Sequence, residues 1–441
     1  MTLDQDFTVD PYFTLTQKRK EHAITEDLIA RHKSKGYECL TGLFGFYRHY
    51  NMHAPVTFKD TGIKALIEDH VSAATPSYPV AWDSREFVLG STFKSNNWGA
   101  AFYHQSSYDW RYFTFTAGVR LDYEKATLSY HSFTSTGYTI IDAAAGKPYA
   151  HEAVDINETG HLHKDFLQVL PKAAITYRLH GNSWQTIYAS VSKGSKAGGF
   201  NTQMFSDVLQ QKLMRFMGIG ASYDVDKIVG YKPEKAWNYE LGSHFECWER
   251  RVKSDLDVFY LDCRDRQLTV FPDGTTTGRV MTNAGKTRSW GAEVAITITP
   301  WQGTGFTVNY GYCNAKFVEY NDGKADYKHN YVPYSPANTL YLDAYHTIDL
   351  NHGDHFKSLT LDANMSAAGQ IYWNEANTVR QPFYALLGAS ATLSGKHYSL
   401  QVWGRNLTDT RYDTFYFVSI SHEFLQRGRG MAVGATLRVN L

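Results

Sequence analysis

Long hydrophobic runs are missing from this sequence. No apolar stretch approaches the 18 residues that a membrane-spanning helix needs, which excludes a helical membrane protein. Acidic and basic residues balance at 44 each, so the charge predicts neither a nucleic-acid partner nor an acidic disordered tail. The four cysteines have no metal-binding spacing, and the chain does not open with a basic segment followed by an apolar core. We therefore predict no metal site and no secretory signal at its start.

Catalytic signatures are also scarce. The sequence contains no nucleophile elbow, no H-E-x-x-H pair and no phosphate-binding loop. Asp255 and Asp257 could be taken as a carboxylate pair for glycoside hydrolysis, but they lie two apart on one predicted strand. Asp262 and Asp265 offer no better pair. We predict that the chain is not an enzyme, with no catalytic residues and no cofactor.

Aromatic residues are abundant instead. The chain has 31 Tyr, 25 Phe, 10 Trp and 34 Gly, spread along its length. Tyr and Trp at this level are typical of strands that carry aromatic girdles at two membrane interfaces. A soluble all-β protein rich in aromatics has a similar composition, so composition leaves both classes open.

Alternation with a period of two is the dominant pattern. In 113–123 the odd positions are Phe, Phe, Ala, Val, Leu and Tyr, and the even positions are Thr, Thr, Gly, Arg and Asp. The same division recurs in 289–298 and 431–441. One face of each strand suits hydrocarbon and the other suits water. Further strands of about ten residues are predicted at 17–30, 37–50, 165–179, 184–192, 237–246, 252–262, 304–316, 337–349, 356–367, 383–393 and 397–408.

The connections between these strands are of two alternating kinds. Short turns are predicted at 105–109, 180–183, 248–251, 300–303, 350–355 and 394–396. Long connections are predicted at 124–164, 193–236, 263–286, 318–336, 368–382 and 409–430, with a short helix near 62–70. Short turns at one side and long loops at the other are the topology of outer-membrane barrels. The predicted fold is therefore all-β, a transmembrane antiparallel β-barrel of about fifteen strands.

Four segments, in order along the chain, carry a resemblance to a known family. They are YASVSKGSKAGGFN at 188–201, YKPEKAWNYELG at 231–242, TNAGKTRSWGAEV at 282–294 and NLTDTRY at 406–412. Together they resemble the barrel strands of TonB-dependent outer-membrane receptors over about 17–441. Any one of them alone is a weak signal, and NLTDTRY by itself is a turn pattern.

The residues of these motifs also have a physical reading of their own. Gly194, Gly198 and Gly199 are expected to let a strand bend into a loop. Asn406 and Asp409 are expected to make local bonds from side chain to backbone. Trp237 and Tyr239 are expected to face lipid.

The resemblance implies an architecture larger than this chain. Family barrels have 22 strands around a folded plug, so about 15–16 of the strands would be present here as one barrel domain, 1–441, beginning at the eighth. The plug, the TonB-contacting segment and the signal peptide would precede Met1. The implied location is the outer membrane of a Gram-negative bacterium, with lipid around a monomer and TonB contacted only through the missing amino-terminal region.

The resemblance also implies a receptor that takes up a scarce, bulky nutrient, with a ferric siderophore as the leading cargo. A receptor for cobalamin or oligosaccharide and a passive porin-like channel remain alternatives. Aromatic and cationic side chains in the predicted loops would suit a planar anionic chelate. The candidate ligand-binding residues are Phe200, Arg215, Tyr223, Tyr327, His329, Tyr331, Tyr334, Tyr372 and Trp373, with Phe205 beside them.

Overall fold

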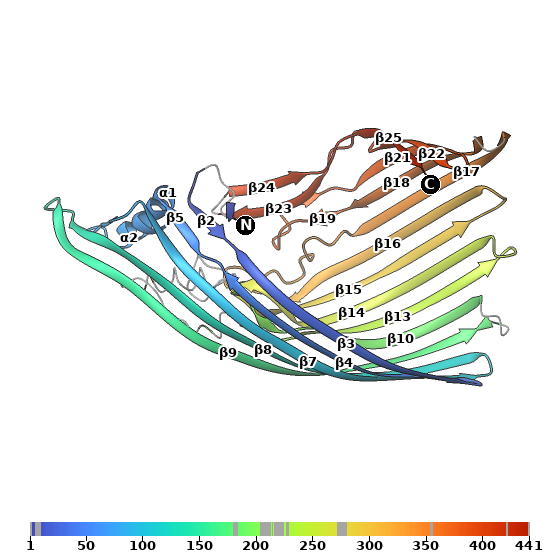
Figure 1. The fold of residues 1–441 in the computed structure, drawn as a ribbon, viewed down its shortest axis with the longest axis horizontal. Coiled ribbons are helices and arrows are strands. Elements are labelled where there is room, and N and C mark those ends of the chain that lie inside the picture. The colour runs from blue at the N-terminus through green and yellow to red at the C-terminus, as the bar shows by residue number, and fades with distance from the viewer. Residues whose placement is uncertain are drawn as a thin grey trace.

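A curved wall of long antiparallel strands makes up most of the molecule (Figure 1). The computed structural model describes residues 2–4, 10–179, 184–202, 213, 215, 225, 229–270, 280–352, 356–419 and 422–439. The wall strands are β3 (Lys18–Ser34), β4 (Tyr37–His53), β7 (Glu86–Trp110), β8 (Phe113–Asp142), β9 (Lys147–Arg178), β10 (Gln185–Lys196), β13 (Glu234–Cys247), β14 (Val252–Val270), β15 (Val280–Ile298), β16 (Thr304–Glu319), β17 (Asn338–His352), β18 (Phe356–Gly369), β21 (Tyr384–Ser394), β22 (Tyr398–Arg405) and β25 (Ala432–Val439).

Each wall strand pairs antiparallel with the next wall strand along the chain. Four members of the nineteen-strand sheet, β1 (Thr2–Asp4), β2 (Phe13–Thr16), β5 (Val56–Lys59) and β6 (Val80–Trp82), are short, and the other fifteen form the wall. The predicted count of fifteen is confirmed. Among the described residues, β3 pairs only with β4 and β25 only with β22, so the barrel is not closed.

The two faces of the wall differ as the alternation predicts. On β8, Phe115, Val119 and Leu121 are among the exposed large hydrophobic residues of the chain. Leu128, of opposite parity on the same strand, is fully buried beneath the loops that pack on the wall. We call the face that carries Leu128 the inner face and the face that carries Leu121 the outer face.

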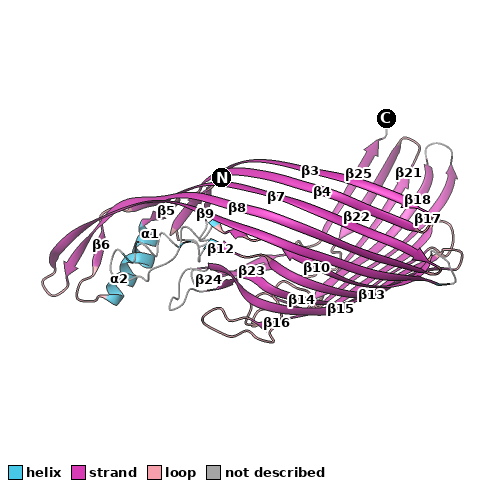
Figure 2. Cartoon of the chain, turned by 90° about the horizontal axis from the view of Figure 1, so that it is seen from below, coloured by secondary structure: helices cyan, strands magenta, loops and turns pink. Residues whose placement is uncertain are grey.

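Short turns join the strands at one end of the wall, called the turn end, and long connections join them at the other, called the loop end (Figure 2). The turns predicted at 248–251, 300–303 and 394–396 are confirmed. The turn predicted at 105–109 is wrong, because β7 continues to Trp110 and the turn is at 111–112. The polar residues that suggested a turn are paired instead: Ser107 Oγ and Thr116 Oγ1 lie 2.9 Å apart across β7 and β8. The predicted turn at 180–183 lies outside the described residues.

The long connection predicted at 124–164 is also wrong. Strands β8 and β9, of 30 and 32 residues, stay paired through most of this range and close in a tight turn at 143–146. In that turn Asp142 Oδ1 accepts hydrogen bonds from the backbone N–H groups of Ala144 and Ala145. The apolar-outside pattern ends near 123, where these strands pass beyond the band of exposed apolar residues, so the sequence signal of a strand ends there too.

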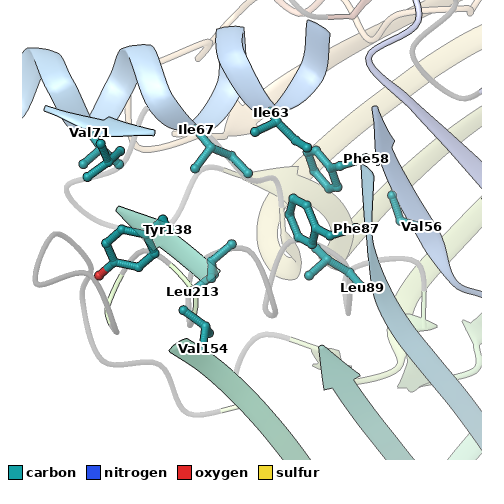
Figure 3. Packing of buried hydrophobic residues seen from close by; sticks show 11 residues of the cluster. Val56, Phe58, Ile63, Ile67, Val71, Phe87, Leu89, Tyr138, Val154 and Leu213 are labelled. Atoms are coloured by element: carbon teal, nitrogen blue, oxygen red, sulfur yellow. The ribbon is translucent and has the colours of Figure 1, made fainter. Parts of the chain in front are cut away.

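The predicted helix near 62–70 is confirmed as a helical segment of three parts, α1 (Asp60–Ile63), η1 (Lys64–Glu68) and α2 (Asp69–Ala74). It covers the inner face of the projecting strands at the loop end (Figure 2). Ile63 and Ile67 point from it toward Phe58 and Phe87, and Val71 lies on the side of Tyr138 (Figure 3). Burial of these side chains holds the helical segment, which would be too short to persist alone. No side chain caps the start of α1. Glu68 Oε1, in η1, accepts a hydrogen bond of 2.5 Å from the backbone N–H of Trp82, which ties the segment to β6.

The remaining described strands are short pairs at the loop end. They are β11 (Gly199–Phe200) with β12 (Gly230–Tyr231), β19 (Ile371–Tyr372) with β20 (Arg380–Gln381), and β23 (Asp413–Ser419) with β24 (His422–Arg427). No helix within the described ranges is long and apolar enough to cross a membrane.

Candidate ligand site at the loop end

Three of the four family-like segments meet at the loop end of the wall. The side-chain amide of Gln267, on β14, donates to the carbonyls of Ala197 at 2.8 Å and Lys232 at 3.1 Å. Asn283 Oδ1, on β15, accepts from Lys232 N–H at 2.7 Å, and Asn283 Nδ2 donates to the Lys232 carbonyl at 2.8 Å. These bonds fix the loop that follows β10 against β14 and β15, which explains why the motifs occur together.

The glycines of the first segment do different things. A Cβ on Gly198 would lie 2.6 Å from Cζ of Phe166 and 2.8 Å from the backbone oxygen of Tyr231, so only glycine fits there. Gly194 is in the regular part of β10, opposite Ala236, with open space around its Cα. The prediction that Gly194 bends the chain is therefore wrong, because the strand continues to Lys196.

The loop at 197–202 closes one side of a cavity of about 490 Å³. Most of the rest of the lining comes from four wall strands, β3, β4, β7 and β8, and Tyr231 of β12 completes it with Gln17. The side chains that give the cavity its character are Arg19, Arg48, Tyr50, Phe46, Asn97, Glu124, Phe200 and Tyr231. The lining of the cavity therefore combines charged and polar side chains with aromatic rings.

Two arginines dominate the charge of this cavity. Arg19 Nη2 lies 2.6 Å from Glu21 and Arg48 Nε lies 2.5 Å from the same carboxylate. The guanidinium carbon of Arg19 also stands 4.5 Å from the centroid of the Tyr50 ring. Lys125 is a third cation in the lining, so three cations face the two carboxylates of Glu21 and Glu124. The remaining positive charge beside an aromatic face suits an anionic, planar ligand.

Of the predicted candidates that the structure describes, Phe200 alone lines this cavity. Its ring lies 5.9 Å from Lys164 Nζ and packs against the buried cluster around Leu128. Burial raises the pKa of the neighbouring Tyr231, so that phenol stays neutral and able to donate a hydrogen bond.

A second aromatic group forms where the loops after β16 and β18 meet. The rings of Tyr331 and Tyr372 stack 5.2 Å apart at 15°. Those of Tyr334 and Trp373 lie 5.3 Å apart, and the Tyr334 hydroxyl donates to the Tyr416 carbonyl. Tyr334 as a whole is 46% exposed, but desolvation of its hydroxyl raises the pKa of the phenol. The structure thus brings these four predicted candidates into one cluster, separate from Phe200.

The other candidates are placed elsewhere. The Tyr327 ring lies 5.3 Å from that of Tyr320, tilted by 40°, and its hydroxyl donates to Asp322 at 3.1 Å, inside its own loop. His329 is exposed, with a left-handed backbone at φ 72°. Arg215 is exposed. Tyr223 and Phe205 lie outside the described residues.

The predicted turn at 406–412 has the expected local bonding. Asn406 Oδ1 accepts from Thr410 N–H at 2.9 Å, while its amide donates to the Thr410 and Arg429 carbonyls. Asp409 Oδ1 accepts from Met431 N–H at 2.9 Å. This turn therefore ties the loop end of β22 to the start of β25 and is structural.

Sequence reasoning missed Arg19, Arg48 and Tyr50. These residues are on predicted wall strands rather than in loops, and their inward direction follows from strand parity that the sequence already contains. Within the described residues, no group of three or more His, Cys, Asp or Glu side chains is arranged to hold a metal ion.

A wall of meandering antiparallel strands, apolar outside and polar within, with short turns at one end, is the architecture of an outer-membrane β-barrel protein. Residues 6–407 match the family described as TonB dependent receptor-like, beta-barrel, and the chain belongs to that family. Its members are receptors and transporters, so the prediction that the chain is not an enzyme is confirmed.

Individual relatives agree with this family. The chain is 25% identical over 329 residues to pesticin receptors of Yersinia enterocolitica and Yersinia pestis, covering 74% of this chain and 41% of those proteins. Its fold is similar to the ferric yersiniabactin uptake receptor FyuA of Yersinia pestis, with a TM-score of 0.70 and 20% identity over 97% of this chain and 55% of FyuA. The siderophore receptor PiuA of Acinetobacter baumannii gives 0.55 and 15% over 97% and 66%. The match spans about two fifths of the length of the pesticin receptors.

Proposed function

We propose that this chain, as a single wall domain over 1–441, is the barrel part of an outer-membrane receptor for a ferric siderophore. In the complete receptor, uptake is energised through TonB. The receptor is a monomer, and outer-membrane lipid surrounds its wall. Membership of the receptor family and the names of relatives such as FyuA support this proposal. No nucleic-acid partner is proposed.

The observation that carries the proposal is the cavity beneath the loop at 197–202. Arg19 and Arg48 supply positive charge on the inner face, and Tyr50 and Phe200 supply aromatic surface. Ferric chelates with anionic, planar donor groups match both features. The cluster of Tyr331, Tyr334, Tyr372 and Trp373 is proposed as an additional contact at the loop end.

The alternative of a passive channel is disfavoured by one feature. The inner face at the loop end is covered by the helical segment 60–74 and by the loop at 197–202, both packed on apolar side chains. A porin constriction would instead need rings of charge around open water. Binding of cobalamin and of an oligosaccharide in the experiment below distinguishes receptors for those ligands from a ferric siderophore receptor.

The test is ligand binding by the detergent-purified chain, measured by tryptophan fluorescence and by calorimetry. The probes are ferric yersiniabactin, a ferric catecholate, cobalamin and maltohexaose. We expect a ferric chelate to bind and the double variant R19Q/R48Q to lose affinity by about tenfold or more. The control R31Q/K33Q removes two charges from the same face of β3 at the turn end and should bind as the unmodified chain does. Binding of cobalamin or maltohexaose alone, or an equal loss in the control, would overturn the proposal.

A further inference from the structure

A row of charged side chains crosses the outer face of β14 to β16 at the loop end, and Trp237 of β13 lies in the same row beside Asp262. The sheet register places Asp262 beside Arg288, and Arg288 beside Lys316. The adjacent row on the same face, two residues nearer the turn end, contains Tyr239, Tyr260 and Trp290. Exposed fractions of 47%, 38% and 51% show that these three rings are open to the surroundings.

Asp262 organises the cations of this row. Its side chain is only 10% exposed, and it accepts from Arg264 Nε at 2.9 Å and from Arg288 Nε at 3.3 Å. The two arginine side chains are themselves 63% and 49% exposed. The carboxylate is thus covered, while the guanidiniums that it orients present their remaining N–H groups outward.

A third cation continues the row. Lys316 Nζ lies 4.6 Å from the centroid of the Tyr331 ring, and the two residues form a β-bridge. The Tyr331 ring in turn stacks on Tyr372. The aromatic pair therefore supports the lysine on the outer face, beside the two arginines.

The charged row lies at the depth of the lipid phosphate groups. Tyr and Trp belts mark the level of the lipid headgroups, and two residues of strand add about 6–7 Å beyond that level. Lipid phosphates lie at this depth, and guanidiniums bind phosphate oxygens in paired hydrogen bonds. Below the aromatic row the same face continues with Leu241, Val258 and Ala292, against which acyl chains can pack.

We propose that Arg264, Arg288 and Lys316 form a binding site for the phosphate group of an outer-leaflet lipid. The proposal rests on the membrane placement given under the proposed function. A lipid, rather than free phosphate, fits the site because the charged row is continuous with an apolar strip that only an acyl chain would cover. The site is on the opposite face of the wall from the ligand cavity.

The test measures lipid binding to the detergent-purified chain by native mass spectrometry. The probes are diphosphorylated lipid A, the same lipid without its phosphates, and inorganic phosphate. We expect the phosphorylated lipid to bind at least tenfold more tightly than the other two, and R264Q/R288Q to abolish that preference. The control K20Q/K94Q removes two charges from the outer face of β3 and β7 and should keep it.

Removal of both arginines leaves Asp262 covered and without its partners, which could destabilise the wall. The triple variant D262N/R264Q/R288Q avoids this problem and should give the same loss. Equal binding of the three probes, an unchanged preference in the triple variant, or tighter binding of inorganic phosphate would each overturn the proposal. Ferric chelate binding by these variants should be unchanged, which separates this site from the ligand cavity. Lack of any lipid binding by the unmodified chain would instead contradict the membrane placement itself.

Discussion

The side-chain amide of Gln267 donates a hydrogen bond of 2.8 Å to the backbone carbonyl of Ala197, seventy residues earlier in the chain. The same amide also binds the Lys232 carbonyl. One side chain of β14 therefore holds the loop that closes the ligand cavity to the segment that leads into β13.

Substitution of Gln267 by Ala should loosen this loop. Both amide bonds are lost, and two carbonyl groups are left without that donor, at a cost of about 1–3 kcal/mol. Trypsin should then cut after Lys196, at the start of the loop, several times faster than in the unmodified chain. Q401A, in the wall strand β22, serves as the control and should leave the rate unchanged. An equal rate in Q267A would show that the loop is held by other contacts.

Gly198→Ala should distort the cavity, whereas Gly194→Ala should be tolerated. The new Cβ at 198 would meet both the Phe166 ring and the Tyr231 backbone oxygen, and crowding of this kind costs about 1–3 kcal/mol. At 194 no atom lies within 4 Å of the added carbon. Thermal unfolding in detergent and ferric chelate binding would be compared for the two variants. Similar behaviour of both would contradict the close packing at Gly198.

Ile67→Ala should detach the helical segment 60–74 from the inner face. Ile67 is completely buried among the side chains of Figure 3, and truncation of such a residue costs about 2–5 kcal/mol. Hydrogen exchange should accelerate in 60–74 and stay slow in the wall strands. Ile24→Ala, at a position 67% exposed on β3, provides the comparison and should change neither. Uniform acceleration over the chain would mean that the segment is not a separate unit.

Tyr334 should ionise only at high pH. Although the residue is 46% exposed, desolvation of its hydroxyl, which donates to the Tyr416 carbonyl, raises its pKa above the ordinary value of about 10, so the folded state favours the neutral phenol. The stability that this provides is complete below about pH 10 and is lost as the pH rises through the raised pKa. The difference in absorbance at 295 nm between the unmodified chain and Y334F should therefore titrate above pH 10. A midpoint at or below 10 would show that the hydroxyl is not desolvated in the folded chain.

The strand count, the alternating faces and three of the six short turns could be predicted from the sequence. Period-two alternation is a local signal, and it is strong wherever one face meets an apolar surrounding. It failed at 124–164, where β8 and β9 extend past that surrounding and their inner face packs on a helix instead. It also failed at Gln105, because polar residues within a strand resemble a turn until their cross-strand partners are known.

The ligand site was predicted less well than the fold. Tyr331, Tyr334, Tyr372 and Trp373 were found as loop aromatics, and they do form one cluster. Arg19 and Arg48 were not predicted, because both lie on wall strands and the candidates were all loop residues. The wall alternation places both on the inner face. Their shared contact with Glu21 depends on the register between β3 and β4, which sequence patterns alone do not define.

The central claim is that the two faces of the wall meet different surroundings, hydrocarbon outside and water within. Nitroxide labels at single cysteines along 255–262 on β14, in a chain reconstituted into lipid vesicles with its four native cysteines replaced, test this directly. Collision with oxygen should be high at 256, 258 and 260 and low at 255, 257 and 261, and collision with a water-soluble nickel complex should show the opposite pattern. The same accessibility at odd and even positions would contradict the account.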